Sequence, residues 1–251
     1  ETVAHSDMPE LERWVLHRLA ELDAVLRRAV DDYDFHTIAT ELHNFCAVDL
    51  SAFYFDIRKD SIYCDSAGTL RRRAARTVMA EVFSFLTAWL APITCFTAEE
   101  AWLARPGDMP DGKAESVHLR LYPTIPSAWL DAALGEKWKT VRALRRVVTG
   151  ALELERAEKR IGSSLQAAPT VHAAPDYVKA FEGLDLRDIC ITSGGELIAG
   201  EAPAGAFTLP DVAGVAVMPT LAEGTKCARC WQVLEEVGKS PAHPLICRRC
   251  E

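Results

Sequence analysis

Residues 226–251, KCARCWQVLEEVGKSPAHPLICRRCE, contain two Cys-x-x-Cys pairs that decide how this end of the chain folds. The cysteines are Cys227, Cys230, Cys247 and Cys250, and 16 residues separate the two pairs. Each pair turns two sulfurs into one space, so that together they supply four thiolates for a tetrahedral zinc with Zn–S bonds of about 2.3 Å. Because every ligand position is a cysteine, no coordination site is left for water. The spacing therefore predicts one structural zinc ion per chain.

Other uses of these residues were weighed against zinc. A redox-active Cys-x-x-Cys typically occurs singly, at the head of a helix after a strand, so the doubled pattern favours the metal. His243 lies between the pairs in an expected loop, and we expect it not to bind the ion because four cysteines already have ligand spacing. The other cysteines have no regular spacing and indicate small apolar side chains in a reducing compartment. They are Cys46, Cys64, Cys95 and Cys190.

A ribbon of this size has no hydrophobic core of its own, and the metal takes over that role. Arg229 lies inside the first cysteine pair, and Trp231 directly follows it. An exposed tryptophan beside a guanidinium suits stacking on an unpaired base while nearby cations contact phosphate. Packing of Trp231 on a neighbouring domain agrees equally well with the spacing, so the ribbon alone leaves both interpretations open.

Helical periodicity dominates the chain before residue 162. A first helix is expected after residues 7–10, a second is capped by Asp34, and a third runs from about Ser66 until Pro92 interrupts it. The stretch TAEE at 97–100 has the pattern of a capping box and predicts a short helix. By contrast, SVHLRLYP at 116–123 alternates like a short strand or extended strap.

A very long helix is expected to begin at Ser127. Lys159 and Arg160 would lie in its last turn, and Gly162 would follow in the position of a left-handed cap. This helix also carries a basic cluster that offers phosphate contacts, supported only by charge. The cluster consists of Arg142, Arg145 and Arg146.

The expected fold class is mainly α. An antiparallel helix bundle would occupy residues 1–161, and a four-cysteine zinc ribbon would occupy residues 225–251. Between them, residues 162–224 would form a small α/β junction domain, because short apolar runs are broken there by glycine and proline. No apolar run approaches the roughly 20 residues that cross a bilayer. Because "ETVAHSDMPELERW" has no charged-then-apolar leader, we expect an excised part of a longer protein.

The net charge of −8 is unevenly distributed along the chain. Residues 1–66 contain 14 acidic and 6 basic side chains, whereas the rest of the chain contains 22 of each. Binding to nucleic acid depends on the local field and not on the total charge. The acidic composition therefore does not exclude a nucleic-acid partner for the later segments.

Several motifs resemble one protein family. The ribbon resembles the C-terminal zinc ribbon of bacterial isoleucyl-tRNA synthetases, down to its Cys-x-Arg-Cys-Trp opening and its HPLICRRC close. YDFHTIATELHNFCAVDLSAFYFDIRKDSIYCD and LAPITCFTAEEAWL resemble the helical anticodon-binding domain of that family, and EKRIGSSLQA resembles the junction after its long helix. The resemblance runs in order from about Leu11 to Cys250.

This resemblance implies a cytoplasmic parent protein that charges tRNA(Ile) with isoleucine in an ATP-dependent reaction. The bundle and the C-terminal domains would reach the anticodon stem-loop, with Arg229 and Trp231 first among the base-contacting candidates.

The family's catalytic motifs, His-x-Gly-His and Lys-Met-Ser-Lys-Ser, do not occur in the sequence, and no insertion is large enough for an editing domain. We therefore expect no catalytic residue and no ATP binding in this chain. We also expect a monomer, with neither a membrane nor DNA as partner. The family usually continues with a short tail beyond its last cysteine, so we expect any contacts of that tail to be missing.

Two alternatives from other classes were considered. Formamidopyrimidine-type DNA glycosylases end in a similar ribbon, but they need an N-terminal proline nucleophile with a glutamate beside it, and this chain begins ETVAHS. A helix bundle with a zinc ribbon is also compatible with a protein-interaction module. The helical motifs favour the synthetase interpretation over both.

Overall fold

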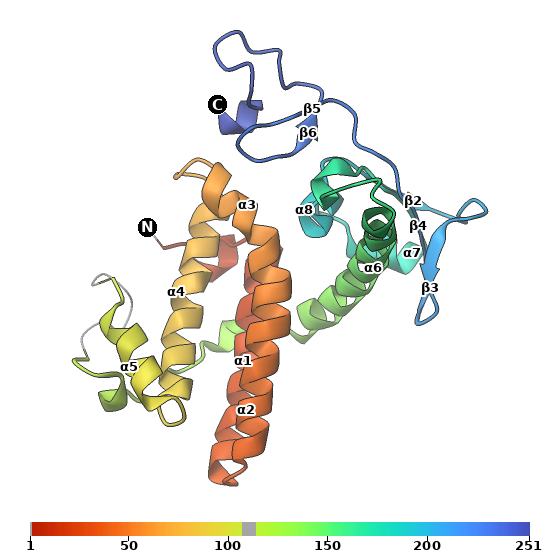
Figure 1. The fold of residues 1–251 in the computed structure, drawn as a ribbon. Helices are drawn as coiled ribbons and strands as arrows, with labels where there is room; N and C mark the ends of the chain where they lie inside the picture. Colours follow the sequence, from red (N-terminus) through yellow and green to blue (C-terminus); the bar gives the residue numbers. More distant parts are fainter. Residues whose placement is uncertain (1, 107–113) are drawn as a thin grey trace. The chain divides into compact units, whose positions relative to one another are not determined.

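The computed structural model describes residues 2–106 and 114–251 and divides into two compact units. The first unit comprises Glu1–Ile62 and Ser66–Ala132, and the second comprises Tyr63–Asp65 and Ala133–Glu251. Helices dominate, and a small mixed sheet follows (Figure 1). Four cysteines gather near the C-terminus. The expected fold class is thereby confirmed. The boundaries at 161/162 and 224/225 stay a prediction about which segments fold independently.

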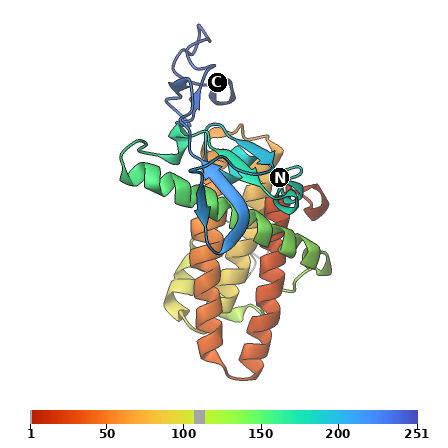
Figure 2. The same ribbon diagram turned by 90° about the vertical axis from the view of Figure 1, so that its right-hand side faces the viewer.

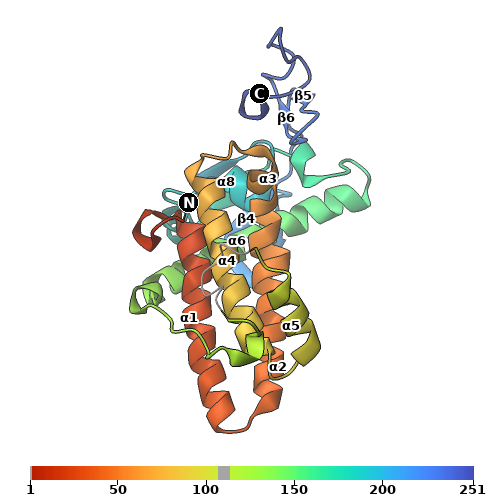
Figure 3. The same cartoon turned by 90° about the vertical axis from the view of Figure 1, so that its left-hand side faces the viewer.

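The first unit is built from antiparallel helices. In Figures 1 and 3, α1 and α2 form a long hairpin, and α4 packs against α1 and against α5. A stretch with wider helical turns, Phe45–Phe55, continues α2 into α3. The bounds are α1 Glu10–Asp31, α2 Phe35–Asn44, α3 Asp56–Cys64, α4 Leu70–Leu90 and α5 Cys95–Leu103, with single 3-10 turns at His5–Asp7, Val117–Leu119 and Ser127–Trp129.

The apolar stripes of these helices form the core that their periodicity predicts. Asp34 caps α2 as expected, because its Oδ1 accepts a hydrogen bond from the Thr37 N–H at 3.0 Å. Trp14 of α1 meets Phe53 edge to face, with ring centroids 5.2 Å apart. Burial of such aromatic side chains dominates core energetics, and the edge-to-face geometry adds to it.

A buried ion pair joins α1 to α3. Arg58 donates from Nε to Glu12 Oε1 at 2.6 Å and from Nη2 to Oε2 at 2.9 Å, and the Tyr54 hydroxyl donates to Oε1 at 3.1 Å. The side chains of Glu12 and Arg58 are 0% and 4% exposed. Burial, followed by the Glu12 charge, raises the pKa of the Tyr54 hydroxyl well above its ordinary value. The carboxylate is therefore held by three donors that replace water.

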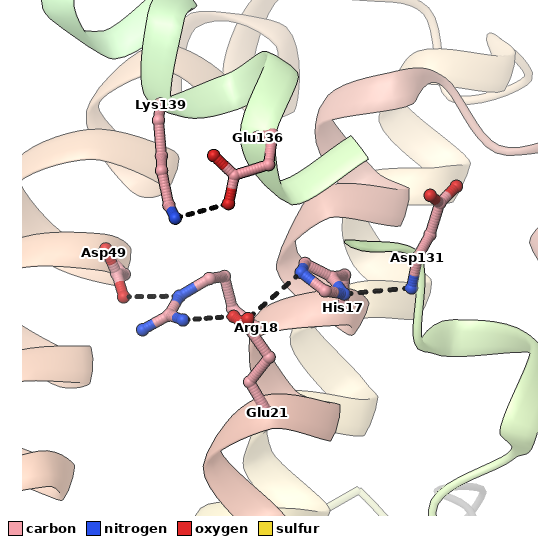
Figure 4. Close-up of polar contacts among 7 residues, drawn as sticks. All are labelled: His17, Arg18, Glu21, Asp49, Asp131, Glu136 and Lys139. Carbon is pink, nitrogen blue, oxygen red and sulfur yellow. Dashed lines mark hydrogen bonds and ion pairs between the residues drawn. The ribbon is translucent and has the colours of Figure 1, made fainter. Parts of the chain in front are cut away.

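Polar contacts along α1 fix neighbouring segments of the same unit (Figure 4). Arg18 bonds Glu21 and also Asp49, the latter at 3.2 Å, and His17 Nδ1 accepts the Asp131 N–H at 3.0 Å. Arg18 is thus held between two carboxylates and is poorly suited to binding phosphate. The same figure shows an exposed pair on α6 of the second unit, between Glu136 and Lys139 at 2.6 Å.

The predicted capping box at 97–100 is wrong. Helix α5 begins at Cys95 with Thr94 as its N-cap, so Thr97 lies inside the first turn. The backbone N–H of Thr94 donates to Leu90 O at 2.7 Å, and the Ala98 N–H donates to Thr94 O at 2.8 Å. The turn after α4 is closed by a hydrogen bond to a carbonyl at the end of α4. Helix α5 therefore begins two residues before Thr97, which the sequence pattern had favoured as the cap.

Of the two alternatives for 116–123, a short strand or an extended strap, the short strand is not formed, whereas Arg120 after the first turn has extended backbone. Val117–Leu119 forms a 3-10 turn, and Leu119 and Leu121 are 73% and 89% exposed, so the alternation does not bury one face. The Val117 N–H donates to Glu99 Oε2 at 2.7 Å, and Arg120 donates to Ser84 O at 3.0 Å. Glu99 of α5 and the Ser84 carbonyl of α4 accept hydrogen bonds from this segment in place of a partner strand.

The second unit combines a long helix with a four-stranded sheet. The sheet has the order β2-β1-β4-β3, in which β1 and β2 are parallel and the other neighbours antiparallel. The helix bounds are α6 Ala132–Ala157, α7 Pro175–Ala180 and α8 Leu186–Cys190, and the strand bounds are β1 Thr170–Ala173, β2 Glu196–Ala199, β3 Phe207–Leu209 and β4 Val212–Met218.

Helix α6 packs against the edge strand β3 where glycine removes a side chain. A Cβ placed at Gly150 would lie 3.0 Å from Cε1 of Phe207. Figure 2 shows β3 and β4 in blue lying across the green helix. Arg145 donates to Ile189 O at 2.8 Å, and Arg146 pairs with Asp211 at 2.5 Å. The helix is therefore tied to the α/β segment by packing and by polar bonds.

Both predicted ends of the long helix need correction. Ser127–Trp129 forms a separate 3-10 turn, and α6 begins only at Ala132. At the other end Lys159, with φ of 60°, takes the left-handed position that was expected of Gly162. The Arg160 N–H reaches back to Glu155 O at 2.9 Å and the Lys159 N–H to Arg156 O at 3.0 Å. This is the bonding of a Schellman cap, with lysine in place of glycine.

In the part of the chain that the structure describes, no helix combines the length and apolar character needed to span a membrane.

The buried ion pair generates the first prediction. Arg58→Met leaves the Glu12 carboxylate buried without its main partner, so we expect the free energy of unfolding to fall by about 3–5 kcal/mol. Urea unfolding followed by circular dichroism measures this change. The matched control is Lys139→Met, which breaks the exposed pair and should change stability by less than about 0.5 kcal/mol. Equal effects of the two variants would contradict the prediction.

Candidate metal centre and nucleic-acid interface

The four predicted ligands converge. The sulfurs of Cys227, Cys230, Cys247 and Cys250 all lie within 4.8 Å of one another, and all four residues are buried. A tetrahedron with Zn–S bonds of about 2.3 Å has edges of about 3.8 Å, and the Cys230 and Cys247 sulfurs are 3.7 Å apart. Disulfide sulfurs would be about 2.05 Å apart. The donor set and its spacing fit a structural zinc with no open position.

The electrostatics of the cluster agree with a bound cation. Burial disfavours the Cys227 thiolate, yet backbone N–H groups of Cys230, Cys247 and Arg229 outweigh it and lower the pKa of Cys227 to about 6. Burial raises the pKa of Cys230 to about 12 and also raises that of Cys250. Four thiolates so close together repel one another, and a divalent cation removes that repulsion.

Short strands and one glycine frame the cluster. β5 (Thr225–Lys226) pairs antiparallel with β6 (Val233–Leu234), as labelled in Figures 1 and 3. Gly224 precedes this hairpin with φ of 119°, and a Cβ there would lie 2.3 Å from the carbonyl carbon of Leu234. Val237 is buried against the cysteines. Apart from these contacts the metal ligands supply most of the ribbon's interior.

Arg229 acts as a strut within the second unit. Its Nη1 donates to Cys250 O at 2.9 Å, and its Nη2 donates to Tyr63 O at 3.3 Å. Cys64 is buried against the four ligand cysteines, and Asp65 lies 3.7 Å from Arg249. The guanidinium therefore bonds two backbone carbonyls, although it keeps other N–H donors that can face a ligand.

Trp231 is positioned as an exposed platform. Its side chain is 60% exposed, and its backbone has φ of 68°, a left-handed conformation that is uncommon for a bulky residue. The Trp231 N–H donates to Cys227 O at 3.0 Å, so the first cysteine pair fixes this turn. The Lys226 ammonium lies 5.3 Å from the ring centroid. An aromatic face with an adjacent cation is thus presented to solvent.

The basic cluster of α6 is engaged within its own unit. Arg145 bonds a backbone carbonyl of α8, and Arg146 pairs with Asp211 while both side chains stay more than half exposed. Arg142 is half-buried. All three lie along one helix, and the bonds of Arg145 and Arg146 leave fewer of their N–H groups for contact with phosphate.

Sequence reasoning missed several partners of the ribbon. Lys226 beside the tryptophan ring was identifiable from its adjacency to the first cysteine. Ser193, whose Oγ accepts the Val233 N–H at 2.8 Å, and Cys64 come from distant segments and carry no local signal. His243 is exposed and is not part of the four-sulfur group.

Comparison with known families agrees with this geometry. Residues 12–171 match the anticodon-binding domain of tRNA ligase, which covers more than half of the chain. The chain belongs to this family. Residues 224–251 match the zinc finger found in FPG and IleRS. The ribbon match alone spans both enzyme types, and the helical match is what favours the tRNA ligase over the DNA glycosylase.

Individual relatives point the same way. The chain is 52% identical over 250 residues to isoleucine–tRNA ligase of Agrobacterium fabrum, 53% to that of Brucella abortus and 48% to that of Bartonella henselae. Each alignment covers 99% of this chain and 25% of the relative. The chain thus spans about a quarter of the length of the curated relatives it matches, and it resembles their C-terminal part.

The metal centre generates the second prediction. Protein purified without added zinc should contain one equivalent, and Cys227→Ser should lose most of it because one of four ligands is gone. The matched control is Cys95→Ser, which removes an exposed cysteine outside the cluster and should retain the metal. Helical circular dichroism should persist after chelation, since the ribbon contains little helix. Two disulfides in metal-free wild type, or helicity lost together with zinc, would contradict this account.

Proposed function

We propose that this chain recognises the anticodon stem-loop of tRNA(Ile) as part of an ATP-dependent isoleucine–tRNA ligase. The observation that carries the proposal is the match to an anticodon-binding domain over residues 12–171, joined to a zinc ribbon that exposes an aromatic platform. The isoleucine–tRNA ligases among the relatives support isoleucine as the amino acid of the parent protein.

Trp231 is the first candidate for a base contact. Proteins that bind unpaired RNA stack splayed bases on aromatic side chains and place cations beside them. The 60% exposed ring, the Lys226 ammonium at 5.3 Å and a backbone held by the cysteine pair supply these elements together. Arg229 is proposed as a second contact through donors that its two carbonyl bonds leave over.

Phosphate contacts are assigned to the basic cluster of α6 in a supporting role. Arg146 is 56% exposed and its bond to Asp211 is at the surface, so phosphate can compete for it. Arg142 and Arg145 would set position without reading sequence.

The remaining parts of the proposal concern the parent protein. Amino-acid activation with ATP would belong to segments outside these 251 residues, and the chain would act in the cytoplasm as a monomer without DNA as a partner. One zinc per chain would support the ribbon, and the domains would be 1–161, 162–224 and 225–251.

As a prediction, the purified chain should give only background isoleucine-dependent pyrophosphate exchange, because it lacks the two catalytic motifs of the family. Measurable exchange by this chain alone would refute that division of labour.

Removal of the tryptophan ring tests the proposed base contact. Trp231→Ala should weaken binding of tRNA(Ile) by about 1–3 kcal/mol, since base–aromatic stacking is lost. Zinc content and helicity should not change because Trp231 is not a ligand. Fluorescence anisotropy with labelled tRNA at fixed salt measures the affinity.

Leu245→Ala is the matched control for this test. It also shortens an exposed apolar side chain of the ribbon, 70% exposed, and should leave the affinity unchanged. The discriminating measurement compares tRNA(Ile) with a copy whose anticodon is altered. If wild type and Trp231→Ala show the same preference between the two RNAs, Trp231 does not contact an anticodon base.

A further inference from the structure

The zinc ribbon has little apolar contact with the rest of the second unit. Among the residues that the structure describes, the buried cluster around the four metal ligands includes one residue from outside 225–251, which is Cys64. The ion fixes the inside of a ribbon, but it does not fix how the ribbon is oriented on its neighbours. That orientation therefore depends mainly on polar contacts.

One of these polar contacts joins the ribbon to the segment after α8. The Val233 N–H of β6 donates to Ser193 Oγ at 2.8 Å, whereas Arg229 Nη2 reaches Tyr63 O at 3.3 Å. Ser193 is 6% exposed and presents its hydroxyl on a short side chain, whereas the guanidinium lies at the end of a long one that has more rotamer freedom to lose. The serine contact is thus the shorter and the stiffer of the two.

The Ser193 hydroxyl is itself held in one orientation. A hydroxyl has one proton to donate and two lone pairs with which to accept. Ser193 Oγ donates its proton to Leu165 O at 2.5 Å, which leaves a lone pair for the Val233 N–H. Fully satisfied buried polar groups of this kind make a structure rigid. One hydroxyl therefore joins the ribbon to the junction after α6.

The turn that carries Ser193 is pressed against the same junction, EKRIGSSLQA at 158–167. The Ser193 N–H donates to Ala167 O at 3.1 Å. A Cβ placed at Gly194 would lie 2.8 Å from the Cβ of Ala168, so glycine allows the close approach. A capping box over 163–166 fixes the junction itself. The support behind the hydroxyl is therefore held by several backbone bonds.

The Ser193 contact lies next to the exposed ring of the ribbon. Trp231 is two residues before Val233, and between them Gln232 O accepts the Cys227 N–H at 2.8 Å. The Trp231 N–H donates to Cys227 O at 3.0 Å. The ring, the first metal ligand and the donor to Ser193 thus belong to one short, internally bonded stretch. Any rotation of this stretch turns the ring with it.

We propose that Ser193 is a positioning residue for the RNA contact: its hydroxyl locks β6 to the junction after α6 and so sets the direction in which the Trp231 ring faces. The inference rests on the proposed function, because it concerns the orientation of the ring assigned there to RNA. Ser193 acts through Trp231 and does not touch the RNA. A ring held in its binding orientation loses less freedom on association, so the hydroxyl contributes to affinity.

A double-mutant cycle tests whether Ser193 acts through Trp231. Ser193→Ala should weaken binding of a fluorescein-labelled anticodon stem-loop of tRNA(Ile) about five-fold, as the loss of one net hydrogen bond does. In the Trp231→Ala background the same change should alter the affinity by less than about two-fold, because the positioned ring is gone. Fluorescence anisotropy at one low salt concentration measures all four affinities. Zinc content and helical circular dichroism should stay the same in each variant.

Thr192→Val is the matched control. The Thr192 hydroxyl is also buried, and it donates to Gly194 O at 2.8 Å within the same turn and not to the ribbon. Its removal should leave the affinity within about two-fold of wild type. If Thr192→Val weakens binding as much as Ser193→Ala does, the stability of the turn and not the Ser193 hydroxyl is responsible, and the inference is overturned.

Amide hydrogen exchange observes the proposed lock directly. In zinc-loaded wild type, the Val233 N–H should be protected, and NMR should show it exchanging faster in Ser193→Ala. The Cys227 N–H is the internal reference, because its bond to Gln232 O lies within the ribbon and should keep its exchange rate. An unprotected Val233 amide in the wild-type protein overturns the inference without reference to any variant.

The outcomes separate this inference from the proposed function. A loss that disappears in the Trp231→Ala background supports Ser193 as a positioning residue. An equal loss in both backgrounds, or no loss from Ser193→Ala while Trp231→Ala weakens binding, overturns the inference and leaves the proposed function standing. If wild-type protein fails to bind the stem-loop at low salt, the proposed function is rejected and this inference with it.

Discussion

Four thiolates confined within 4.8 Å of one another are the constraint on which the C-terminal segment depends. Burial raises the pKa of Cys230 to about 12, so the cluster resists full ionisation until a cation compensates for its charge. The surrounding ribbon offers one buried valine and two short strands, which is too little apolar surface for an independent fold. Metal binding and folding of this segment are therefore one equilibrium, and every side chain that the ribbon presents inherits its position from the ion.

The basic side chains of the second unit differ in how much of their charge faces solvent. Arg229 uses two of its donors on backbone carbonyls, and Arg145 donates from Nε to the Ile189 carbonyl of α8. Such hydrogen bonds fix the position of the guanidinium group, and they leave fewer of its N–H donors for contact with a polyanion. By contrast Arg248 is 83% exposed, and Lys226 lies against an exposed ring. The RNA recognition that we propose for this unit would then depend more on aromatic and guanidinium surfaces than on net charge, in line with an acidic chain.

Local signals in the sequence predicted local structure well. The two Cys-x-x-Cys pairs predicted the four-sulfur cluster, and Asp34 marked its helix start, because each pair and the cap are patterns of residues a few positions apart. The capping box at 97–100 was wrong because the preceding turn closed on Leu90 O. Of the two alternatives at 116–123, the short strand did not form because Glu99 accepts the Val117 N–H. The hydrogen bond from Arg229 to the Tyr63 carbonyl joins residues 166 positions apart in the sequence, and a small cavity beside the end of α6 is lined by three separated segments. No local pattern encodes either of them.

Backbone strain is held in the same way at two exposed positions of the second unit. Trp231 and Lys159 both have positive φ, at 68° and 60°, where a glycine would avoid a cost of roughly 1–2 kcal/mol. At Trp231 the cysteine pair holds the turn, and at Lys159 the two Schellman bonds do so. Glycine at either position would relieve the backbone and delete the ring or the ammonium group. Tyr33 and Ile191 also have positive φ and no part in the proposed function, so the backbone conformation alone does not mark a functional side chain. At Trp231 the strained turn holds the exposed ring that we propose to stack on an RNA base.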